Sequence, residues 1–169
     1  MSQSTQQHRQ AAPKAVRCAV VTVSDTRTLE NDRGGQLLEE SLAAAGHTVT
    51  RREIVPDDPN RIRSLVEDLA DANLLDAILI TGGTGIAARD QTYETVSQLL
   101  TKTLPGYGEL FRMLSYAEIG ATAMLSRAVG GLVQHTVVLT MPGSPAGVRL
   151  AMEKVILPDL AHLIREARR

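Results

Sequence analysis

Aromatic residues are scarce in this chain of 169 residues, which has three tyrosines, one phenylalanine and no tryptophan. A hydrophobic core must therefore be built from leucine, valine, isoleucine, alanine and methionine. All four aromatics fall within 24 consecutive residues. We expect this cluster to serve subunit contacts or local packing; its members are Tyr93, Tyr107, Phe111 and Tyr116.

Cysteine is limited to Cys18, which excludes an internal disulfide and a cysteine metal cluster. Because Cys18 lies in an apolar segment, we expect a small core residue rather than a nucleophile. The histidines are far apart and show no metal-ligand spacing such as HExxH. We assign no catalytic role to any of them; they are His8, His47, His135 and His162.

Charge of either sign is not in excess, with 18 Lys and Arg against 19 Asp and Glu. This balance argues against nucleic acid as the main partner, because such a partner requires a basic face. No apolar run reaches the roughly 18 residues of a membrane-spanning helix, and residues 1–13 lack the apolar stretch of a signal peptide. We therefore expect no membrane partner, a cytoplasmic location, and a mobile tail over residues 1–14 before a single domain at residues 15–169.

Short β-branched segments alternate with helical ones along the chain. Residues 17–23 (RCAVVTV) and 75–80 (LDAILI) are almost continuously apolar, which is typical of strands covered on both faces. Residues 48–55 carry adjacent charges and suit an edge strand, whereas residues 127–141 hold two β-rich segments spaced for a hairpin. This order predicts an α/β domain with three α/β/α layers and a mostly parallel sheet that ends in a C-terminal hairpin.

Prolines and polar residues mark the expected helix boundaries. A helix is predicted from near Thr92 to about Leu100. Pro105-Gly106 is expected to break the chain before a helical stretch at residues 108–117, and Pro158 to start the terminal helix.

Ligands of open α/β sheets bind beyond the carboxyl ends of the strands. Three segments should converge there: residues 24–26, the TGGTG loop at 81–85 and the MPGSP segment at 141–145. The TGGTG loop is the sharpest signal, because glycines permit positive φ and let backbone amides approach an anion. A tight strand-to-helix turn explains the same glycines equally well. Neither the Walker A pattern nor GxGxxG is present.

Two aspartates follow strands or loops at this edge. Asp90 or Thr92 most simply caps the next helix; in the functional alternative, Asp90 holds Mg²⁺ beside a phosphate loop, with Thr92 and Glu94 as polar contacts. Asp58 suits a helix cap, which leaves Asp57 free to face the cleft, although a solvated loop carboxylate is the simpler interpretation.

Basic residues near these loops are candidates for phosphate contacts, since phosphate chemistry in a nearly neutral protein needs local positive charge. They are Arg89, Arg112 and Arg127. In the MPGSP segment, Ser144 is placed to cap a helix and Pro145 to occupy its first turn. A sharp turn and a contact with a nucleotide or ring both fit this pattern.

The motifs TGGTG, RDQTYE, PGYGELFRMLS, LSRAVGG and MPGSP occur in this order. Together with VSDTR and IVPDD, they resemble the MoaB/MogA family of molybdenum cofactor biosynthesis proteins. GELFRMLSYAEIG and SRAVGG are most similar to the MoaB branch. The resemblance covers about residues 17–165, and although each motif alone is weak, the five in sequence are specific.

This resemblance implies a molybdopterin-binding fold and a molybdopterin adenylyltransferase. Such an enzyme uses Mg²⁺ and ATP as co-substrate to transfer AMP to the terminal phosphate of molybdopterin, and it releases pyrophosphate. Carried over by motif, Asp57 and Asp90 match the functional aspartates and would hold Mg²⁺. Nucleotide and pterin contacts would come from Thr81, Gly82, Gly83, Thr84, Gly85, Thr92, Glu94, Ser126, Arg127, Pro142, Gly143, Ser144 and Pro145. Pterin stacking then becomes the less favoured alternative role for the aromatic cluster.

The chain departs from the family pattern at two positions. Gly34 follows Asp32-Arg33 where the family commonly has serine, and Tyr93 replaces the proline of Asp-x-Thr-Pro-Glu. These changes motivate an alternative, a non-catalytic molybdopterin-binding or scaffold protein of the same pathway; a general nucleotide-binding domain is a weaker one. The family also implies a homotrimer or a hexamer built as a dimer of trimers, with other proteins of the pathway as further partners. Whether molybdenum or tungsten is the eventual metal stays open.

Overall fold

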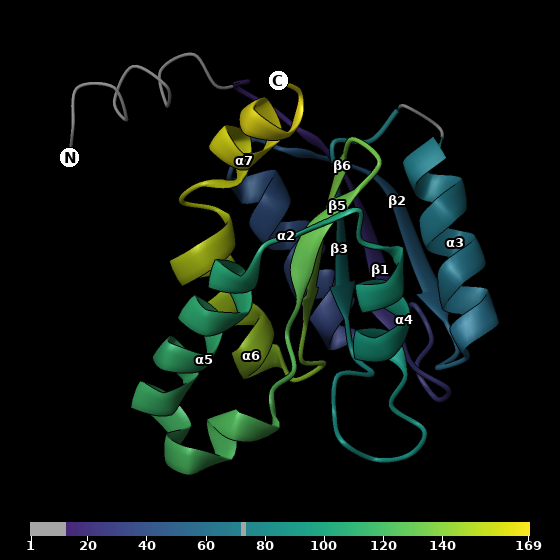
Figure 1. Cartoon of the computed structure of the whole chain (residues 1–169), viewed down its shortest axis with the longest axis vertical. Helices are drawn as coiled ribbons and strands as arrows, with labels where there is room; N and C mark the ends of the chain where they lie inside the picture. The colour runs from purple at the N-terminus through teal and green to yellow at the C-terminus, as the bar shows by residue number, and fades with distance from the viewer. Residues whose placement is uncertain (1–12, 72–73) are drawn as a thin grey trace.

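A six-stranded mixed sheet forms the centre of the protein (Figure 1), whose computed structural model describes residues 13–71 and 74–169. Its strands are β1 Arg17–Val23, β2 Thr48–Val55, β3 Ala77–Thr81, β4 Lys102–Thr103, β5 Gly130–Val133 and β6 Thr136–Met141. They are ordered β2-β1-β3-β6-β5-β4, so β2 lies at an edge as predicted. The pairs among β2, β1, β3 and β6 are parallel, and β5 pairs antiparallel with both β6 and β4. The predicted fold class, including the hairpin, is confirmed.

Helices cover both faces of the sheet (Figure 1). They are α2 Arg33–Ala44, α3 Pro59–Asp71, α4 Thr92–Leu99, α5 Pro105–Ile119, α6 Pro145–Leu150 and α7 Leu160–Ala167, with a 3₁₀ helix η1 Gly120–Leu125 and a π-helical segment η2 Ala151–Ile156. Successive strand residues point to opposite faces. In β1, Cys18 and Val20 therefore pack with α2, α5, α6 and α7, while Ala19 and Val21 pack with α3 and α4.

Cys18 is the small core residue that the sequence predicts. Its side chain is fully buried in the sheet. Burial raises the pKa of the Cys18 thiol to about 12, so the group stays protonated and unreactive at neutral pH.

Two helix boundaries differ from the prediction. Pro105 does not precede a helix that starts later; it occupies the first turn of α5, where the missing N–H leaves no hydrogen bond unmade. The terminal helix α7 begins at Leu160 instead of Pro158. The reason is that η2 extends α6 to Ile156, and residues 157–159 then form a turn.

The aromatic cluster divides between core and surface. Tyr107 and Phe111 are buried, and the Tyr107 hydroxyl donates to the carbonyl of Thr140 at 2.9 Å. Tyr116 is 65% exposed. Local packing therefore accounts for two members of the cluster, while a subunit contact for Tyr116 stays a prediction.

The predicted tail at residues 1–14 lies, up to residue 12, outside the described residues. Pro13 and Lys14 precede β1 without helix or strand. Among the residues that the structure describes, no helix is long and apolar enough to cross a membrane.

Candidate functional site

Two loops meet at the carboxyl ends of β3 and β6. The amide of Gly82 donates to the carbonyl of Met141 at 3.0 Å, and the Thr81 hydroxyl donates to the carbonyl of Pro142 at 3.0 Å. Glycine at position 143 permits this approach, because a Cβ on Gly143 would lie 3.3 Å from the Cα of Gly82. The predicted convergence of the TGGTG loop with the MPGSP segment is confirmed.

The TGGTG loop requires glycine at two consecutive positions. Gly82 has a φ of +98°, and a Cβ there would lie 2.3 Å from the carbonyl oxygen of Val23. Gly83 has a φ of +63°, and a Cβ there would lie 2.1 Å from Thr92 Oγ1 and 2.6 Å from Asp57 Oδ2. A side chain at either position would displace the loop, so bare backbone forms this wall of the site.

Three consecutive residues of the loop have amides without acceptors, whereas their carbonyls are occupied. The amides of Gly83, Thr84 and Gly85 donate to no group among the described residues. The carbonyl of Gly83 accepts from the amide of Thr92 at 3.0 Å, and the carbonyls of Thr84 and Gly85 accept from the Arg127 guanidinium. Consecutive free amides in a turn bind anions, so this geometry favours an anion-binding loop over a simple connection.

Asp57 and Asp90 both border this loop. Asp57 lies beside Gly83, and Asp90 lies beside Gly85, where a Cβ would be 2.4 Å from Asp90 Oδ2. Burial raises the pKa of Asp57; the hydrogen bond from the Gln91 amide lowers it, and the nearby charge of Asp90 raises it further. The structure therefore brings together the two aspartates that the sequence selected.

Neither Asp90 nor Thr92 caps α4. The N-cap position is Gln91, whose side chain makes no capping hydrogen bond, and Asp90 Oδ2 accepts from the amide of Ala87 at 2.9 Å instead. The Thr92 hydroxyl is buried and has no hydrogen-bond partner in the described part of the chain. Asp58, in contrast, accepts an amide of the first turn of α3 at 2.9 Å and is a cap, as predicted.

The Asp57 and Asp90 carboxylates, which both border the glycine loop, could contribute ligands to a magnesium ion. Within residues 13–71 and 74–169, no group of three or more His, Cys, Asp or Glu side chains could hold a metal. Magnesium in phosphate-transfer sites takes one or two carboxylates and completes its shell with waters and substrate phosphates. The raised pKa of Asp57 reflects partly desolvated negative charge, which a cation would relieve.

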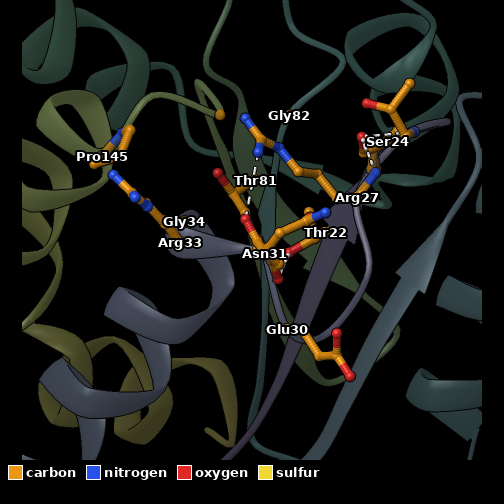
Figure 2. A pocket seen from close by; sticks show the side chains of 14 residues that line it. Thr22, Ser24, Arg27, Glu30, Asn31, Arg33, Gly34, Thr81, Gly82 and Pro145 are labelled. Atoms are coloured by element: carbon orange, nitrogen blue, oxygen red, sulfur yellow. Dashed lines mark hydrogen bonds between the residues drawn. The ribbon is translucent and has the colours of Figure 1, made fainter.

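Two neighbouring cavities share Gly82 and Gly143 as lining residues. The polar cavity, of about 700 Å³, opens toward the start of α2; its lining includes Thr22, Arg27, Asn31, Arg33 and Thr81 (Figure 2). The apolar cavity, of about 400 Å³, opens toward α5; its lining includes Phe111, Ile119, Leu125, Ser126 and Leu150. The site thus has two compartments on one glycine loop.

The polar cavity is lined by two arginines, Arg27 and Arg33, and by two acidic residues, Glu30 and Asp32. Arg27 Nη1 donates to the carbonyl of Asn31 at 3.3 Å (Figure 2). For the described ranges, neither Arg27 nor Arg33 has an acidic partner. Gly34, one of the two departures from the family pattern, brings α2 close to the MPGSP segment, because a Cβ there would lie 3.3 Å from the carbonyl oxygen of Gly143.

A buried polar network that the sequence motifs did not predict borders the polar cavity. Asp32 is 3% exposed and accepts from the Thr22 hydroxyl at 2.8 Å, from the Gly35 amide at 2.9 Å and from Arg52 at 3.2 Å. A Cβ on Gly35 would lie 2.1 Å from Asp32 Oδ2. The available signal was an aspartate at a helix N-cap that is followed by two glycines.

The start of α6 behaves as predicted, and it adjoins a buried hydroxyl. Ser144 accepts from the amide of Gly147 at 3.2 Å, and Pro145 occupies the first turn. Ser126 Oγ, at the apolar cavity, is buried without a hydrogen-bond partner in the part of the chain described. Buried hydroxyls are normally bonded, so the Ser126 hydroxyl has unused hydrogen-bonding capacity at this cavity.

The three predicted arginines separate in space. Arg127 contacts the TGGTG loop and pairs with Glu94. Arg89 pairs with Asp25 at 2.6 Å on the exposed rim. Arg112 donates to a backbone carbonyl shortly before β5 at 3.4 Å. Arg127 is therefore the arginine most closely associated with the loop.

Comparison with known proteins yields consistent matches. Residues 19–162 match the family described as "probable molybdopterin binding domain". Molybdenum cofactor biosynthesis protein B of Bacillus anthracis is 54% identical over 167 residues, which covers 98% of this chain and 99% of that protein.

Solved structures agree with this match. The crystal structure of a molybdenum cofactor biosynthesis protein B has a TM-score of 0.90 and 55% sequence identity, covering 94% of this chain and 99% of that chain. The structure of the tungsten cofactor synthesizing protein MoaB from Pyrococcus furiosus has a TM-score of 0.83 and 34% identity, covering 94% of this chain and 100% of that chain.

Proposed function

The chain belongs to the molybdopterin-binding family of molybdenum cofactor biosynthesis proteins, in its MoaB branch, and we propose that it is a molybdopterin adenylyltransferase. In the proposed reaction, AMP passes from ATP to the terminal phosphate of molybdopterin and pyrophosphate is released, with Mg²⁺ as cofactor. The observation that carries the proposal is the glycine loop, which borders Asp57 and Asp90, lies between two cavities, and has three amides without acceptors in the described residues.

The arrangement of the cavities suits two substrates. ATP and molybdopterin each carry a ring system at one end and phosphate at the other. A phosphate-binding loop shared by two cavities would place the rings apart and the phosphates together, which is the geometry that AMP transfer requires.

This reaction needs little acid–base chemistry from the protein. An oxygen of the molybdopterin phosphate already carries the electron pair that attacks the α-phosphorus of ATP. The bond from that phosphorus to the oxygen bridging the β-phosphate breaks, and this oxygen leaves with its electron pair as part of pyrophosphate. The protein must supply charge neutralisation and in-line placement. Consistently, no histidine or cysteine of the described residues lines either cavity.

Specific groups are available for these tasks. The amides of Gly83, Thr84 and Gly85 would donate to phosphate oxygens. Asp57 and Asp90 would hold Mg²⁺, which when bound supplies positive charge against the phosphates.

Other residues would complete the binding site. Hydroxyl contacts would come from Thr92 and Ser126, whose oxygens are buried without a protein partner in the described chain. Arg27 and Arg33 would add positive charge at the polar cavity. The remaining predicted contacts would shape the walls through loop backbone or side chains; they are Thr81, Gly82, Glu94, Pro142, Gly143, Ser144 and Pro145.

Incubation of the purified protein with molybdopterin, ATP and Mg²⁺ tests the proposal. We expect adenylylated molybdopterin and pyrophosphate in equal amounts, and omission of Mg²⁺ should remove both. A folded protein that yields neither product would contradict the proposal. Calorimetry would then identify the alternative, because binding of molybdopterin without binding of Mg-ATP indicates a non-catalytic pterin-binding or scaffold protein.

The proposal includes a homotrimer or a dimer of trimers. Of nine large hydrophobic side chains exposed in the described residues, six lie on α5 and η1: Leu110, Met113, Tyr116, Ile119, Met124 and Leu125. Such a concentration of apolar surface is typical of a subunit interface. Light scattering should give three or six times the chain mass of 18.2 kDa, and a mass of 18.2 kDa would reject the assembly.

A further inference from the structure

Every nitrogen of the Arg127 guanidinium group donates to an oxygen of residues 84–94, and two of them contact the glycine loop itself. Nε donates to the carbonyl of Thr84 at 3.2 Å, and Nη2 donates to the carbonyls of Gly85 and Asp90, the latter at 3.4 Å. Nη1 forms an ion pair with Glu94 on α4. These partners precede Arg127 by 33 to 43 residues. One side chain therefore ties the loop between β3 and α4 to the segment that leads into β5.

Tyr93 supports the same guanidinium group. The guanidinium carbon of Arg127 lies 5.1 Å from the centroid of the Tyr93 ring, within the range of a cation–π interaction. Tyr93 and Glu94 are neighbours in the first turn of α4. The hydrogen bond from Arg127 lowers the pKa of Glu94, so the carboxylate stays charged. The ring and the carboxylate together restrict the orientation of the guanidinium.

These contacts leave Arg127 little capacity to bind a phosphate directly. A guanidinium has a fixed set of N–H donors in one plane. In Arg127, donors on all three nitrogens already point to protein oxygens, and the side chain is only 23% exposed.

We call the contacts of Arg127 with the carbonyls of Thr84 and Gly85 the clamp. The clamp is important because the loop is rich in glycine. Glycine populates many backbone conformations, so the direction of its amides is not fixed locally. In the described chain, the carbonyls of Thr84 and Gly85 accept from Arg127 and from no other residue. Because a peptide unit is planar, fixing these two carbonyls also fixes the amides on the same planes, those of Gly85 and Ile86.

We infer that Arg127 is a positioning residue: it anchors the carbonyls of Thr84 and Gly85, so that the free amide of Gly85, on the same peptide plane as the Thr84 carbonyl, is held in place for phosphate, and Tyr93 keeps the guanidinium of Arg127 oriented. This role rests on the proposed function for the identity of the phosphate compound. The geometry of the clamp itself does not depend on that identity.

Hydrogen exchange in the absence of ligand tests the clamp. The reporters are three hydrogen-bonded amides between the TGGTG loop and the start of α4, those of Asp90, Gln91 and Thr92. Arg127→Lys keeps the charge but loses the planar fork, and Arg127→Gln loses both. We expect both variants to accelerate exchange at these amides by about tenfold, with exchange elsewhere as in the wild type. Arg63→Lys on the surface of α3 is the matched control and should change nothing at the loop.

Two exchange results would overturn the inference. Unchanged exchange at the loop in both variants would show that Arg127 does not hold it. Faster exchange throughout the domain with a lowered melting temperature would show that Arg127 stabilises the whole fold instead.

Binding of Mg-ATP by calorimetry separates positioning from direct phosphate contact. A positioning role predicts that Arg127→Lys and Arg127→Gln weaken binding alike, by about tenfold. Direct contact through charge predicts that Arg127→Lys binds like the wild type while Arg127→Gln is weakened, and this result would overturn the inference. If the wild type fails to bind Mg-ATP, the proposed function fails, and the exchange measurements still decide the clamp.

Two variants of Tyr93 test whether its ring holds the guanidinium of Arg127 in place. Tyr93→Phe keeps the aromatic face and should match the wild type in loop exchange. Tyr93→Ala removes the ring and should accelerate exchange at the same amides, by less than Arg127→Lys. Equal exchange in the two Tyr93 variants would overturn the role of the ring.

Discussion

Partly desolvated carboxylates lie at both ends of the sheet, in opposite electrostatic surroundings. At the amino ends of β1 and β3, Asp76 accepts from the Arg17 amide at 2.7 Å, and the guanidinium groups of Arg17 and Arg168 both pair with it. At the carboxyl ends, Asp57 has another carboxylate, that of Asp90, as a near neighbour.

The two aspartates accordingly shift in opposite directions. Burial by itself would raise the pKa of Asp76, but the hydrogen bonds from Arg17 and Arg168 lower it below its usual range. Burial raises the pKa of Asp57, and the charge of Asp90 adds to this shift. A carboxylate with two fixed cations serves the fold, whereas one beside another carboxylate is suited to receive a mobile cation.

Replacement of Asp76 should produce the largest effect. In Asp76→Asn, an NH₂ group faces Arg17 and Arg168 where an oxygen accepted, so we expect the free energy of unfolding to fall by about 2 kcal/mol. Urea denaturation measures this loss. Adenylylation under conditions where the variant is folded should stay at the wild-type rate, because Asp76 lies at the opposite end of the sheet. A loss below about 0.5 kcal/mol would contradict the structural role assigned to Asp76.

Replacement of the aspartates at the carboxyl edge should lower turnover and leave stability nearly unchanged, the reverse of what we expect for Asp76→Asn. Asp90→Asn and Asp57→Asn should each reduce turnover by more than about tenfold, which corresponds to about 1.4 kcal/mol, because a magnesium ligand is lost. Each asparagine still offers an oxygen to the loop amide that the aspartate bonded, so the melting temperature should hardly change. Wild-type turnover in either folded variant would contradict these roles.

A smaller effect is expected in the pH dependence of stability, which should show directly that the charge of Asp76 stabilises the fold. The folded-state pKa of Asp76 lies below its unfolded value of about 3.9, so its charge stabilises the fold above that value and the contribution is lost as pH falls through the folded pKa. Asp76→Asn has no such proton to bind. The stability of the wild type should therefore fall more steeply than that of the variant between about pH 5 and pH 3. Parallel curves in urea denaturation would contradict the assignment.

The smallest effect is expected at the rim, where Arg89 pairs with Asp25 at 2.6 Å with both side chains well exposed. Exposed ion pairs contribute little because water screens them, so Arg89→Gln should change the free energy of unfolding by less than about 0.5 kcal/mol. Asp25 also accepts the amide of Asp57 at 3.0 Å, and we expect this hydrogen bond to persist in the variant. A larger loss than in Asp76→Asn would reverse the order on which the comparison depends.

Sequence patterns predicted much of the fold because they act between neighbouring residues. Short apolar, β-branched segments between helical ones predicted the strands. Asp58, Ser144 and Pro145 predicted helix starts through local capping. Pro105 was assigned as a break because a proline both interrupts a helix and suits its first turn, and local sequence does not separate the two.

The candidate site was predicted less completely than the fold. Asp57 and Asp90 were selected from motifs, and the structure places them at the same loop. The Asp32 network was not predicted, because Asp32 caps α2 whereas Arg52 lies in β2, and their contact depends on how β2 packs against α2. Tyr93 departs from the family pattern, and its contact with Arg127 is evident only in the tertiary structure.

By itself, the sequence determined the order of strands and helices, the glycines of the turns and the two aspartates at the carboxyl edge. Tertiary structure alone decided that the loop carbonyls are held by Arg127 while the amides stay free, and that one aspartate is balanced by two arginines while another faces a second carboxylate. The reason is that turns and caps follow from neighbouring residues, whereas charge balance and hydrogen-bond partners depend on groups that packing brings together from distant parts of the chain.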